Sequence, residues 1–163
     1  MKKIILFLLA VAVGFSADAR TKKKKKTQAA NEIISVSMHR TTCYGRCPDY
    51  TIELNKSGLV TYTATMNLPD TGIFTKKLAA VKTMELITKF KDYRVDTCLD
   101  EYDNRIPDLP GIIYEIKYTN KTKKIYNAGW GPGFLKQLAT EMDNFGKQER
   151  DRSWKKTGFI KKK

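Results

Sequence analysis

The chain has 163 residues, of which 31 are Lys or Arg and 17 are Asp or Glu, so its formal net charge is +14 at pH 7. The length suits one folded domain, and a content of 41% hydrophobic and 29% charged residues excludes collagen, a coiled coil and a wholly disordered chain. One His and three Cys exclude most His-rich metal sites and any dense disulfide scaffold.

The first 19 residues have the three parts of a secretory signal peptide. A cationic head at residues 1–3 precedes an apolar run from Ile4 to Phe15 and the small-residue site Ala17-Asp18-Ala19. The run is shorter than the ~20 apolar residues of a membrane-spanning helix, so we predict cleavage after Ala19 and a periplasmic or secreted chain. Dense positive charge directly after this site resists export. Retention at the inner membrane by an uncleaved signal is therefore the alternative.

Positive charge is concentrated near the two ends of the chain. Residues 20–26 carry +6 and residues 150–163 carry +6, whereas residues 27–149 carry only +1. Runs of like charge are typically solvated, so we predict a basic disordered arm over residues 20–32 and a basic tail over residues 149–163. These segments either keep the chain soluble or bind anionic lipid or polysaccharide of a cell envelope, and the near-neutral middle argues against a specific nucleic-acid site. The lysines expected to contact polyanions are Lys22, Lys23, Lys24, Lys25, Lys26, Lys161, Lys162 and Lys163.

Alternation of apolar and polar residues predicts strands in the first half of the middle region. In the first strand, Ile34, Val36 and Met38 are expected to share one face. The sequence from Asn55 to Gly58 has turn chemistry, so the runs on either side of it are typical of a β-hairpin. The predicted strands cover residues 33–40, 50–54, 59–66 and 73–78.

The second half predicts two helices and further strands. Apolar residues recur every three or four positions over residues 79–91, and again from Phe134 to Phe145, which is typical of helices with one apolar face. Residues 93–111 are acidic and irregular and are expected to form a long loop with room for one short strand. Residues 112–118 and 124–128 alternate, and Lys124, Tyr126 and Ala128 are expected to share a face. We therefore predict a single two-layer α+β domain over residues 33–148, with an antiparallel sheet of five to six strands and two helices packed on one face.

The most informative stretch is the loop that contains Cys43, Gly45, Cys47 and Pro48. Gly and Pro disfavour a helix here, and Gly45 allows the bend that brings the two sulfurs together. In an exported chain a structural disulfide between Cys43 and Cys47 is the simplest outcome. A redox-active pair and a metal site are the alternatives, the latter built from His39, Cys43, Cys47 and Cys98, although the spacing matches neither a Cys-x-x-Cys motif nor a zinc motif.

Other candidate sites have simpler structural explanations. The acidic residues between 96 and 108 depart from the spacing of a calcium-binding loop, and the loop from Gly129 to Gly133 precedes a helix but lacks a phosphate-binding fingerprint. Trp130 is either a cover over the core or an exposed contact. We expect no cofactor, no metal ion and no catalytic set, because His39 is the single His and no Gly-x-Ser-x-Gly sequence occurs. The acidic residues are Asp96, Asp100, Glu101, Asp103 and Asp108.

The cysteine loop resembles the signature of an uncharacterised family of bacterial secreted and lipoprotein domains, a domain of unknown function. That signature is Cys-x-Gly-x-Cys-Pro-x-Tyr, followed by a glycine turn and a Val-x-Tyr strand, with a later Asp-x-Pro. The resemblance covers residues 33–146 and implies export and a single α+β domain, without an activity. The chain lacks the lipidation Cys of many members, and Cys98 is outside the signature. The matching positions are Cys43, Gly45, Cys47, Pro48, Tyr50, Gly58, Val60, Tyr62, Asp108 and Pro110.

These observations favour an exported, non-catalytic domain that binds a protein or an envelope component, with cationic segments suited to anionic surfaces. The alternative is a thiol-based redox or metal-handling protein centred on Cys43 and Cys47. The specific partner does not follow from the residues.

Overall fold

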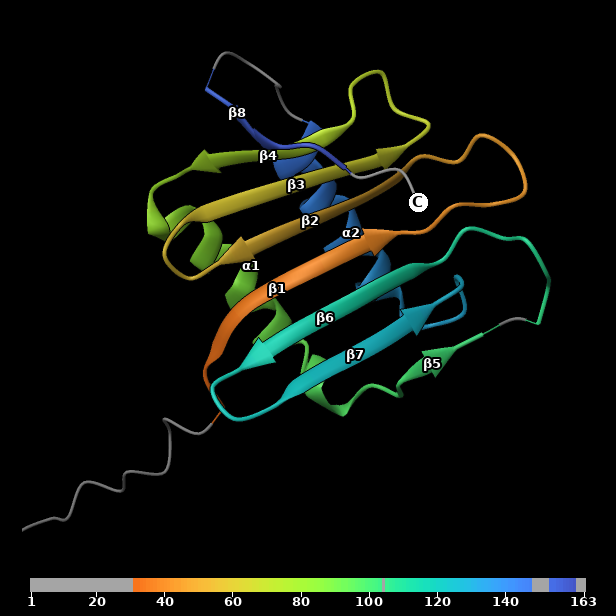
Figure 1. The fold of residues 1–163 in the computed structure, drawn as a ribbon. Coiled ribbons are helices and arrows are strands. Elements are labelled where there is room, and N and C mark those ends of the chain that lie inside the picture. The colour runs from red at the N-terminus through yellow and green to blue at the C-terminus, as the bar shows by residue number, and fades with distance from the viewer. Residues whose placement is uncertain (1–30, 104, 148–152, 161–163) are drawn as a thin grey trace, which may run out of the picture.

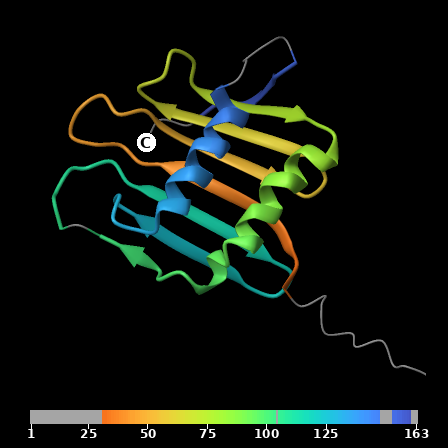
Figure 2. The same cartoon turned by 180° about the vertical axis from the view of Figure 1, so that it is seen from behind.

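A computed structural model describes residues 31–103, 105–147 and 153–160 of the chain. These residues form one eight-stranded sheet in the order β5-β7-β6-β1-β2-β3-β4-β8, together with two α-helices. Every neighbouring pair is antiparallel except β5 and β7, which are parallel. Figure 1 shows the sheet from its open face, with both helices behind it, and Figure 2 shows the helices in front. The strands are β1 (Ile33–Arg40), β2 (Asp49–Asn55), β3 (Leu59–Met66), β4 (Gly72–Lys77), β5 (Glu101–Tyr102), β6 (Ile112–Tyr118), β7 (Thr122–Asn127) and β8 (Lys155–Gly158).

The prediction of a single α+β domain with two helices on one face is confirmed, whereas the predicted count of five to six strands is too low. The two further strands are β5, with two residues, and β8, with four. β5 lies in the loop expected to have room for one short strand, whereas β8 was not predicted. Neither is long enough to show an alternating pattern, and β8 is rich in lysine. It lies inside the segment predicted as a basic tail, where it pairs with the edge strand β4.

The turn between β2 and β3 forms as its residues predict. Asn55 Oδ1 accepts hydrogen bonds from the N–H groups of Ser57 and Leu59 at 2.9 and 3.1 Å. Gly58 adopts a φ of 91°, a left-handed conformation that L side chains rarely adopt. Its carbonyl accepts a hydrogen bond from Leu78 N–H at 2.9 Å, which ties the turn to the chain just before α1.

The core lies between one face of the sheet and the helices α1 (Ala80–Asp92) and α2 (Gly133–Lys147). The alternating strand residues of β2 and β3 point inward as predicted, and the helices supply stripes at helical spacing. The opposite face of the sheet is polar and carries ion pairs, such as Lys117 with Glu53 and Lys124 with Glu115. The buried helix residues include Thr83, Leu86, Ile87 and Phe90 in α1, and Leu135, Leu138, Ala139, Met142 and Asp143 in α2.

Two predicted strand faces differ from the structure. A register shift between Ile33 and Ser35 places Ile33 in the core and leaves Ile34 exposed, because a bulge reverses the alternation at that point. In β7 the buried residues are Ile125 and Asn127, so the predicted face of Lys124 and Tyr126 is the solvent face.

The predictions for residues 1–30 fall outside the described residues. They comprise the signal peptide and the lysines from Lys22 to Lys26, and the same holds for Lys161, Lys162 and Lys163. Within the described part of the chain, neither helix has the length and the apolar character that a bilayer crossing requires.

Candidate functional site

The loop between β1 and β2 contains the two cysteines that lie four residues apart. Cys43 and Cys47 are joined in a disulfide, with their Cα atoms 5.5 Å apart, as the spacing predicts. Cys43 Sγ accepts a hydrogen bond from Gly45 N–H at 3.4 Å. The closed ring projects Tyr44 into solvent, with 92% of the residue exposed, and fixes the position from which Cys47 and Pro48 lead into β2.

Hydrogen bonds on both sides hold this loop in place. Thr41 N–H donates to the carbonyl of Gly111 at 3.0 Å, and Gly111 N–H donates to Thr41 Oγ1 at 2.9 Å. On the other side, Asn67 Nδ2 donates to the carbonyl of Cys47 at 2.9 Å. The disulfide loop and the loop before β6 are therefore held directly to each other by the Thr41–Gly111 hydrogen bonds.

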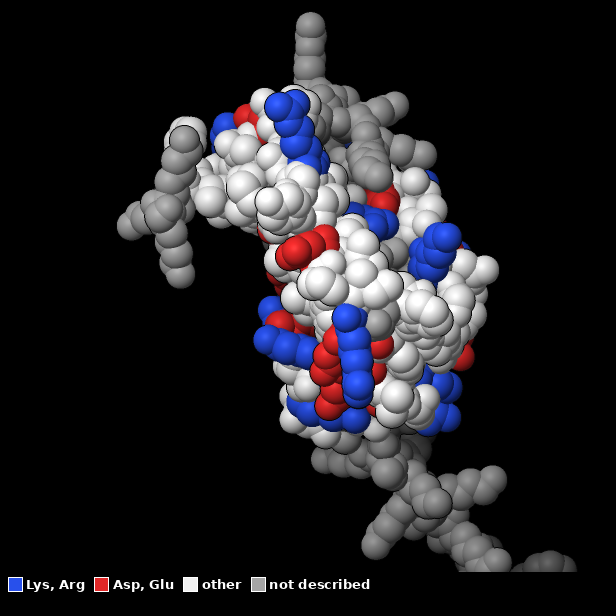
Figure 3. Space-filling model, turned by 90° about the vertical axis from the view of Figure 1, so that its right-hand side faces the viewer, with Lys and Arg blue, Asp and Glu red and all other residues white. Residues whose placement is uncertain are grey.

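These loops enclose a pocket of about 610 Å³ at one end of the sheet. The ends of β1 and β7, the starts of β2 and β6, and α2 from Gly133 to Asp143 all contribute to it. The volume falls within the ~300–1,000 Å³ range of small-molecule sites. Figure 3 faces this end of the molecule and shows acidic and basic side chains interspersed among uncharged ones.

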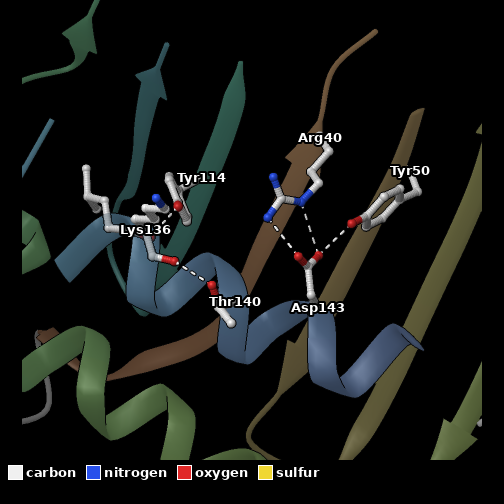
Figure 4. Close-up of polar contacts among 7 residues, drawn as sticks. Arg40, Tyr50, Tyr114, Lys136, Thr140 and Asp143 are labelled. Atoms are coloured by element: carbon white, nitrogen blue, oxygen red, sulfur yellow. Dashed lines mark hydrogen bonds and ion pairs between the residues drawn. The ribbon is translucent and has the colours of Figure 1, made fainter. Parts of the chain in front are cut away.

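The wall of the pocket beneath α2 contains a buried carboxylate with three charge-assisted hydrogen bonds. Arg40 donates to Asp143 from Nε at 3.1 Å and from Nη2 at 2.7 Å, which is a two-pronged contact. Tyr50 donates its hydroxyl proton to the same carboxylate at 2.5 Å. Figure 4 shows both side chains pointing at Asp143 from adjacent strands. The charge of Asp143 is thus neutralised inside the protein before any ligand arrives.

The electrostatics of this cluster keep Tyr50 protonated and Arg40 charged. Burial raises the pKa of Tyr50 far above its ordinary range, and the hydrogen bond and charge of Asp143 raise it further. Burial lowers the pKa of Arg40, but the hydrogen bond and charge of Asp143 outweigh that effect, so the net pKa is raised. The cluster therefore supplies a neutral hydroxyl and a fixed ion pair, and neither group is poised to exchange a proton near neutral pH.

A second tyrosine fixes the start of α2. Tyr114, on β6, donates its hydroxyl proton to the carbonyl of Leu135 at 2.6 Å, and burial raises its pKa. Thr140 Oγ1 donates to the carbonyl of Lys136 at 3.1 Å (Figure 4). Arg40, Tyr50 and Tyr114 come from three neighbouring strands, so α2 is held to the sheet by polar contacts as well as by its apolar stripe.

The glycine-rich loop before α2 also lines the pocket. Asn127, the last residue of β7, accepts hydrogen bonds at its Oδ1 from the N–H groups of Gly129 and Gly131, at 2.9 and 3.0 Å. Gly129 has a φ of 102°, which this tight turn requires. Trp130 lies between these glycines and is 71% exposed, so it is an exposed contact and does not cover the core.

The structure separates the residues proposed for a metal site. His39 Nε2 lies 3.1 Å from Asp49 Oδ1, whereas Cys98 follows α1 and its carbonyl accepts a hydrogen bond from Lys123, near the start of β7. Cys98 is therefore at the end of the sheet opposite the disulfide. In the described ranges, no group of three or more His, Cys, Asp or Glu side chains is placed to bind a metal ion.

The acidic residues between 96 and 108 are also dispersed. Asp96 pairs with Arg94, Asp100 pairs with Lys123, and Asp103 accepts a hydrogen bond from the N–H of Arg105. Asp108 adopts a φ of 62° in the exposed loop before β6. These carboxylates therefore have separate local contacts and do not converge on one point.

The signature residues divide into two groups. Cys47, Pro48, Tyr50 and Pro110 line the pocket. Gly58 makes the β2–β3 turn at the far end of the strands, and Tyr62 is a core residue whose ring centroid lies 5.5 Å from that of Tyr50. Some signature residues thus line the pocket and others form the turn or the core, a division that the sequence alone did not show.

Sequence reasoning missed four residues of the site: Tyr114, Asn127, Lys136 and Asp143. Asp143 carries a detectable signal, because an acidic residue next to Met142 on an apolar helical stripe points to a buried partner. Asn127 and Lys136 carry no comparable signal, since a polar residue before a glycine loop and an exposed lysine on a helix are both common.

A model of the domain of unknown function DUF6438 matches residues 34–146. The chain belongs to this family. The DUF6438 match begins in β1 and ends in α2, so it contains every residue of the pocket, while β8 lies beyond it. The expected membership of a family of unknown function is confirmed at this level, and bacterial origin and export remain predictions. No curated protein matches the chain.

Proposed function

We propose that this DUF6438 protein is an exported, non-catalytic binding domain whose ligand occupies the pocket at the disulfide end of the sheet. The observation that carries the proposal is the pocket itself, whose walls are fixed before binding by the disulfide and by the Thr41–Gly111 hydrogen bonds. A preformed site avoids the entropic cost of ordering loops when the ligand binds.

The chemistry of the pocket supports binding over catalysis. Among the described residues that line it, none is a His or a free thiol. The carboxylate of Asp143 accepts hydrogen bonds from Arg40 and Tyr50, so it is not available as a general base.

The loops that form the pocket also present exposed apolar side chains. Tyr44 lies in the disulfide loop, Leu109 in the loop before β6, and Trp130 in the loop before α2, and all three are exposed. Tyrosine and tryptophan are enriched where proteins bind partners. Three loops that each offer such a side chain beside one pocket are typical of a recognition surface.

Filling the pocket provides the test. Gly133 lines it, and a Cβ atom at this position would meet no heavy atom within 4 Å. Gly133→Phe therefore places a ring in open space, and replacing glycine in a helix favours the folded state. Val81→Phe, at an exposed position in the first turn of α1, is the matched control for an added ring.

The mature chain from residue 20 and the two variants are immobilised and incubated with a bacterial envelope extract, and the retained molecules are then titrated against each purified protein. We expect a molecule that binds the unmodified protein and Val81→Phe but not Gly133→Phe. Equal binding of every retained molecule to Gly133→Phe would contradict the proposal.

A further inference from the structure

We propose, resting on the pocket's proposed role as the binding site, that its ligand is held by a single carboxylate group that contacts the side chains of Asn127 and Lys136. The ligand class is therefore an organic monoacid. The inference rests on which donors the pocket leaves without partners and on the net charge of its lining.

Asn127 presents a side-chain amide donor to the pocket. The residue is 5% exposed, and its Oδ1 is occupied by the N–H groups of Gly129 and Gly131. Because Oδ1 is the acceptor for two backbone donors, Nδ2 must be the other atom of the amide. Within residues 31–103, 105–147 and 153–160 this Nδ2 has no hydrogen-bond acceptor, although the residue lines the pocket. Among the described residues, Trp154 Nε1 is the buried side-chain polar atom without a hydrogen-bond partner, so Nδ2 of Asn127 is still reached by solvent. An acidic ligand oxygen would accept its hydrogen bond in place of water.

Lys136 supplies a positive charge to the same pocket. It is an exposed residue at the end of the first turn of α2, it lines the same pocket, and no carboxylate of the described chain forms an ion pair with it. A cation near the N-terminus of a helix opposes the helix dipole, and the first turn of α2 has no acidic residue to compensate. Residues whose charge is locally unfavourable for folding are expected mainly at functional positions, and Lys136 is such a residue.

The charge of the lining selects a monoanion. Arg40 and Lys136 are positive and Asp143 is negative, so the charged residues that line the pocket sum to +1. One negative charge on the ligand balances this excess. A dianion such as sulfate would leave one negative charge in the pocket without a compensating positive charge, which disfavours it.

The remainder of the lining is suited to an apolar ligand body. Pro48, Pro110, Ile112 and Pro132 contribute apolar surface, and Trp130 lies at an edge of the site between two lining glycines. A carboxylate attached to an apolar or aromatic group matches this combination. Such a group occurs both at the C-terminus of a peptide and in a small organic acid.

The test uses two carboxylate probes, N-acetyl-phenylalanine and 4-phenylbutyrate, each with its neutral amide, and inorganic sulfate as the dianion. Each probe is titrated into the folded mature protein at low salt and followed by two-dimensional NMR. We expect both acids to shift the side-chain amide signal of Asn127 and to bind roughly tenfold or more tightly than their amides, because a charge-assisted hydrogen bond is lost in the amide. Tighter binding of N-acetyl-phenylalanine identifies a peptide terminus as the source, and equal binding identifies a small acid.

Charge reversal at Lys136 separates recognition from folding. Lys136→Glu removes the ammonium group and repels a carboxylate, whereas the same change at Lys82, exposed in the first turn of α1, is the matched control. Both changes place an acid near a helix N-terminus, so thermal stability is expected to be unchanged or higher in both variants. Acid binding is expected to fall at least tenfold in Lys136→Glu and to stay unchanged in Lys82→Glu.

Four results would overturn the inference. Three are equal binding of acids and amides in the pocket, preferential binding of sulfate, and acid binding that Lys136→Glu leaves intact. Absence of any shift at Asn127 with every acid would overturn it as well. The proposed binding function is judged separately by Gly133→Phe, so a pocket that accepts amides as well as acids would contradict this inference and leave that function standing.

Discussion

Asp143 lies in the interface between α2 and the sheet, and it accepts hydrogen bonds from Arg40 and Tyr50. In Asp143→Asn the guanidinium of Arg40 loses its counter-ion. Breaking a fully buried ion pair costs about 3–5 kcal/mol. The Arg40 side chain is 30% exposed, so we expect a smaller loss, roughly 2–3 kcal/mol in the free energy of unfolding measured with urea.

Asp92→Asn is the control for this substitution, since Asp92 is exposed at the end of α1. It should change the unfolding free energy by less than about 0.5 kcal/mol. A comparably small change in Asp143→Asn would show that apolar packing alone holds α2 against the sheet.

Tyr50 and Tyr114 make the stability of the protein sensitive to alkali. Burial raises both pKa values above the ordinary 10.0, and for Tyr50 the contact with Asp143 adds to the effect. A phenol whose pKa is raised by folding binds its proton more tightly in the folded state. Its stabilisation is therefore complete below about pH 10 and is lost as the pH rises through the folded value.

We expect the free energy of unfolding to fall as the pH rises above about 10. The double variant Tyr50→Phe and Tyr114→Phe should show a smaller fall, even though it is less stable at pH 7 by about 1 kcal/mol for each lost hydrogen bond. Urea unfolding at pH 7 and at alkaline pH measures the difference. Tyr44→Phe, at a solvent-exposed position, should leave the pH profile unchanged. Equal falls in the double variant and the unmodified protein would contradict the assignment.

Part of this cluster could have been predicted from the sequence. Arg40 lies on the same face of β1 as Val36 and Met38, which are buried. An arginine on this inward face implies an acidic partner. The identity of that partner could not be predicted, because Arg40 and Asp143 are 103 residues apart. Their contact depends on where α2 crosses the sheet, and no local pattern encodes that crossing.

Among the elements, the disulfide loop connects β1 to β2 and forms one wall of the pocket. Closing a ring of this size lowers the conformational entropy of the unfolded chain only a little, which stabilises the folded state by about 2 kcal/mol. In the double variant Cys43→Ser and Cys47→Ser we expect a loss of that order, with the fold retained, because the Thr41–Gly111 hydrogen bonds remain. Urea unfolding and far-ultraviolet circular dichroism measure both effects. Unchanged stability combined with loss of a dithiol–disulfide exchange activity would favour a redox role instead.

Elements with a long alternating or helical pattern were predicted closely. The first strand, the hairpin and both helices lie within two residues of their expected bounds, because each buries one regular face. The residues of β5 could not be specified, and β8 was not predicted, because a strand of two or four residues shows no period and its pairing depends on neighbours far along the chain. The same limitation applies to the pocket, which is assembled from three loops and one helix.

Across the whole molecule, the charge is separated between a nearly neutral middle and cationic end segments. We propose that these segments give salt-sensitive attachment to anionic surfaces. Replacing Lys22–Lys26 and Lys161–Lys163 with serine leaves β8 in place and should abolish co-sedimentation with vesicles that contain anionic lipid. Since each lysine near such a surface contributes about 1 kcal/mol, binding by the unmodified protein should weaken as salt is added. Vesicle binding that survives the replacement would contradict this role.

β8 has a consequence for any shortened form of the protein. The family match ends at residue 146, and a chain stopped at Lys147 would lack both β8 and Trp154, whose ring lies against Tyr62 at a centroid distance of 6.4 Å. β4 would then carry a row of backbone N–H and C=O groups with nothing to pair with, beside newly uncovered aromatic surface. An unpaired edge strand readily pairs with a strand of a second molecule. In sedimentation experiments the shortened protein should therefore dimerise or precipitate at concentrations where the full-length protein stays monomeric.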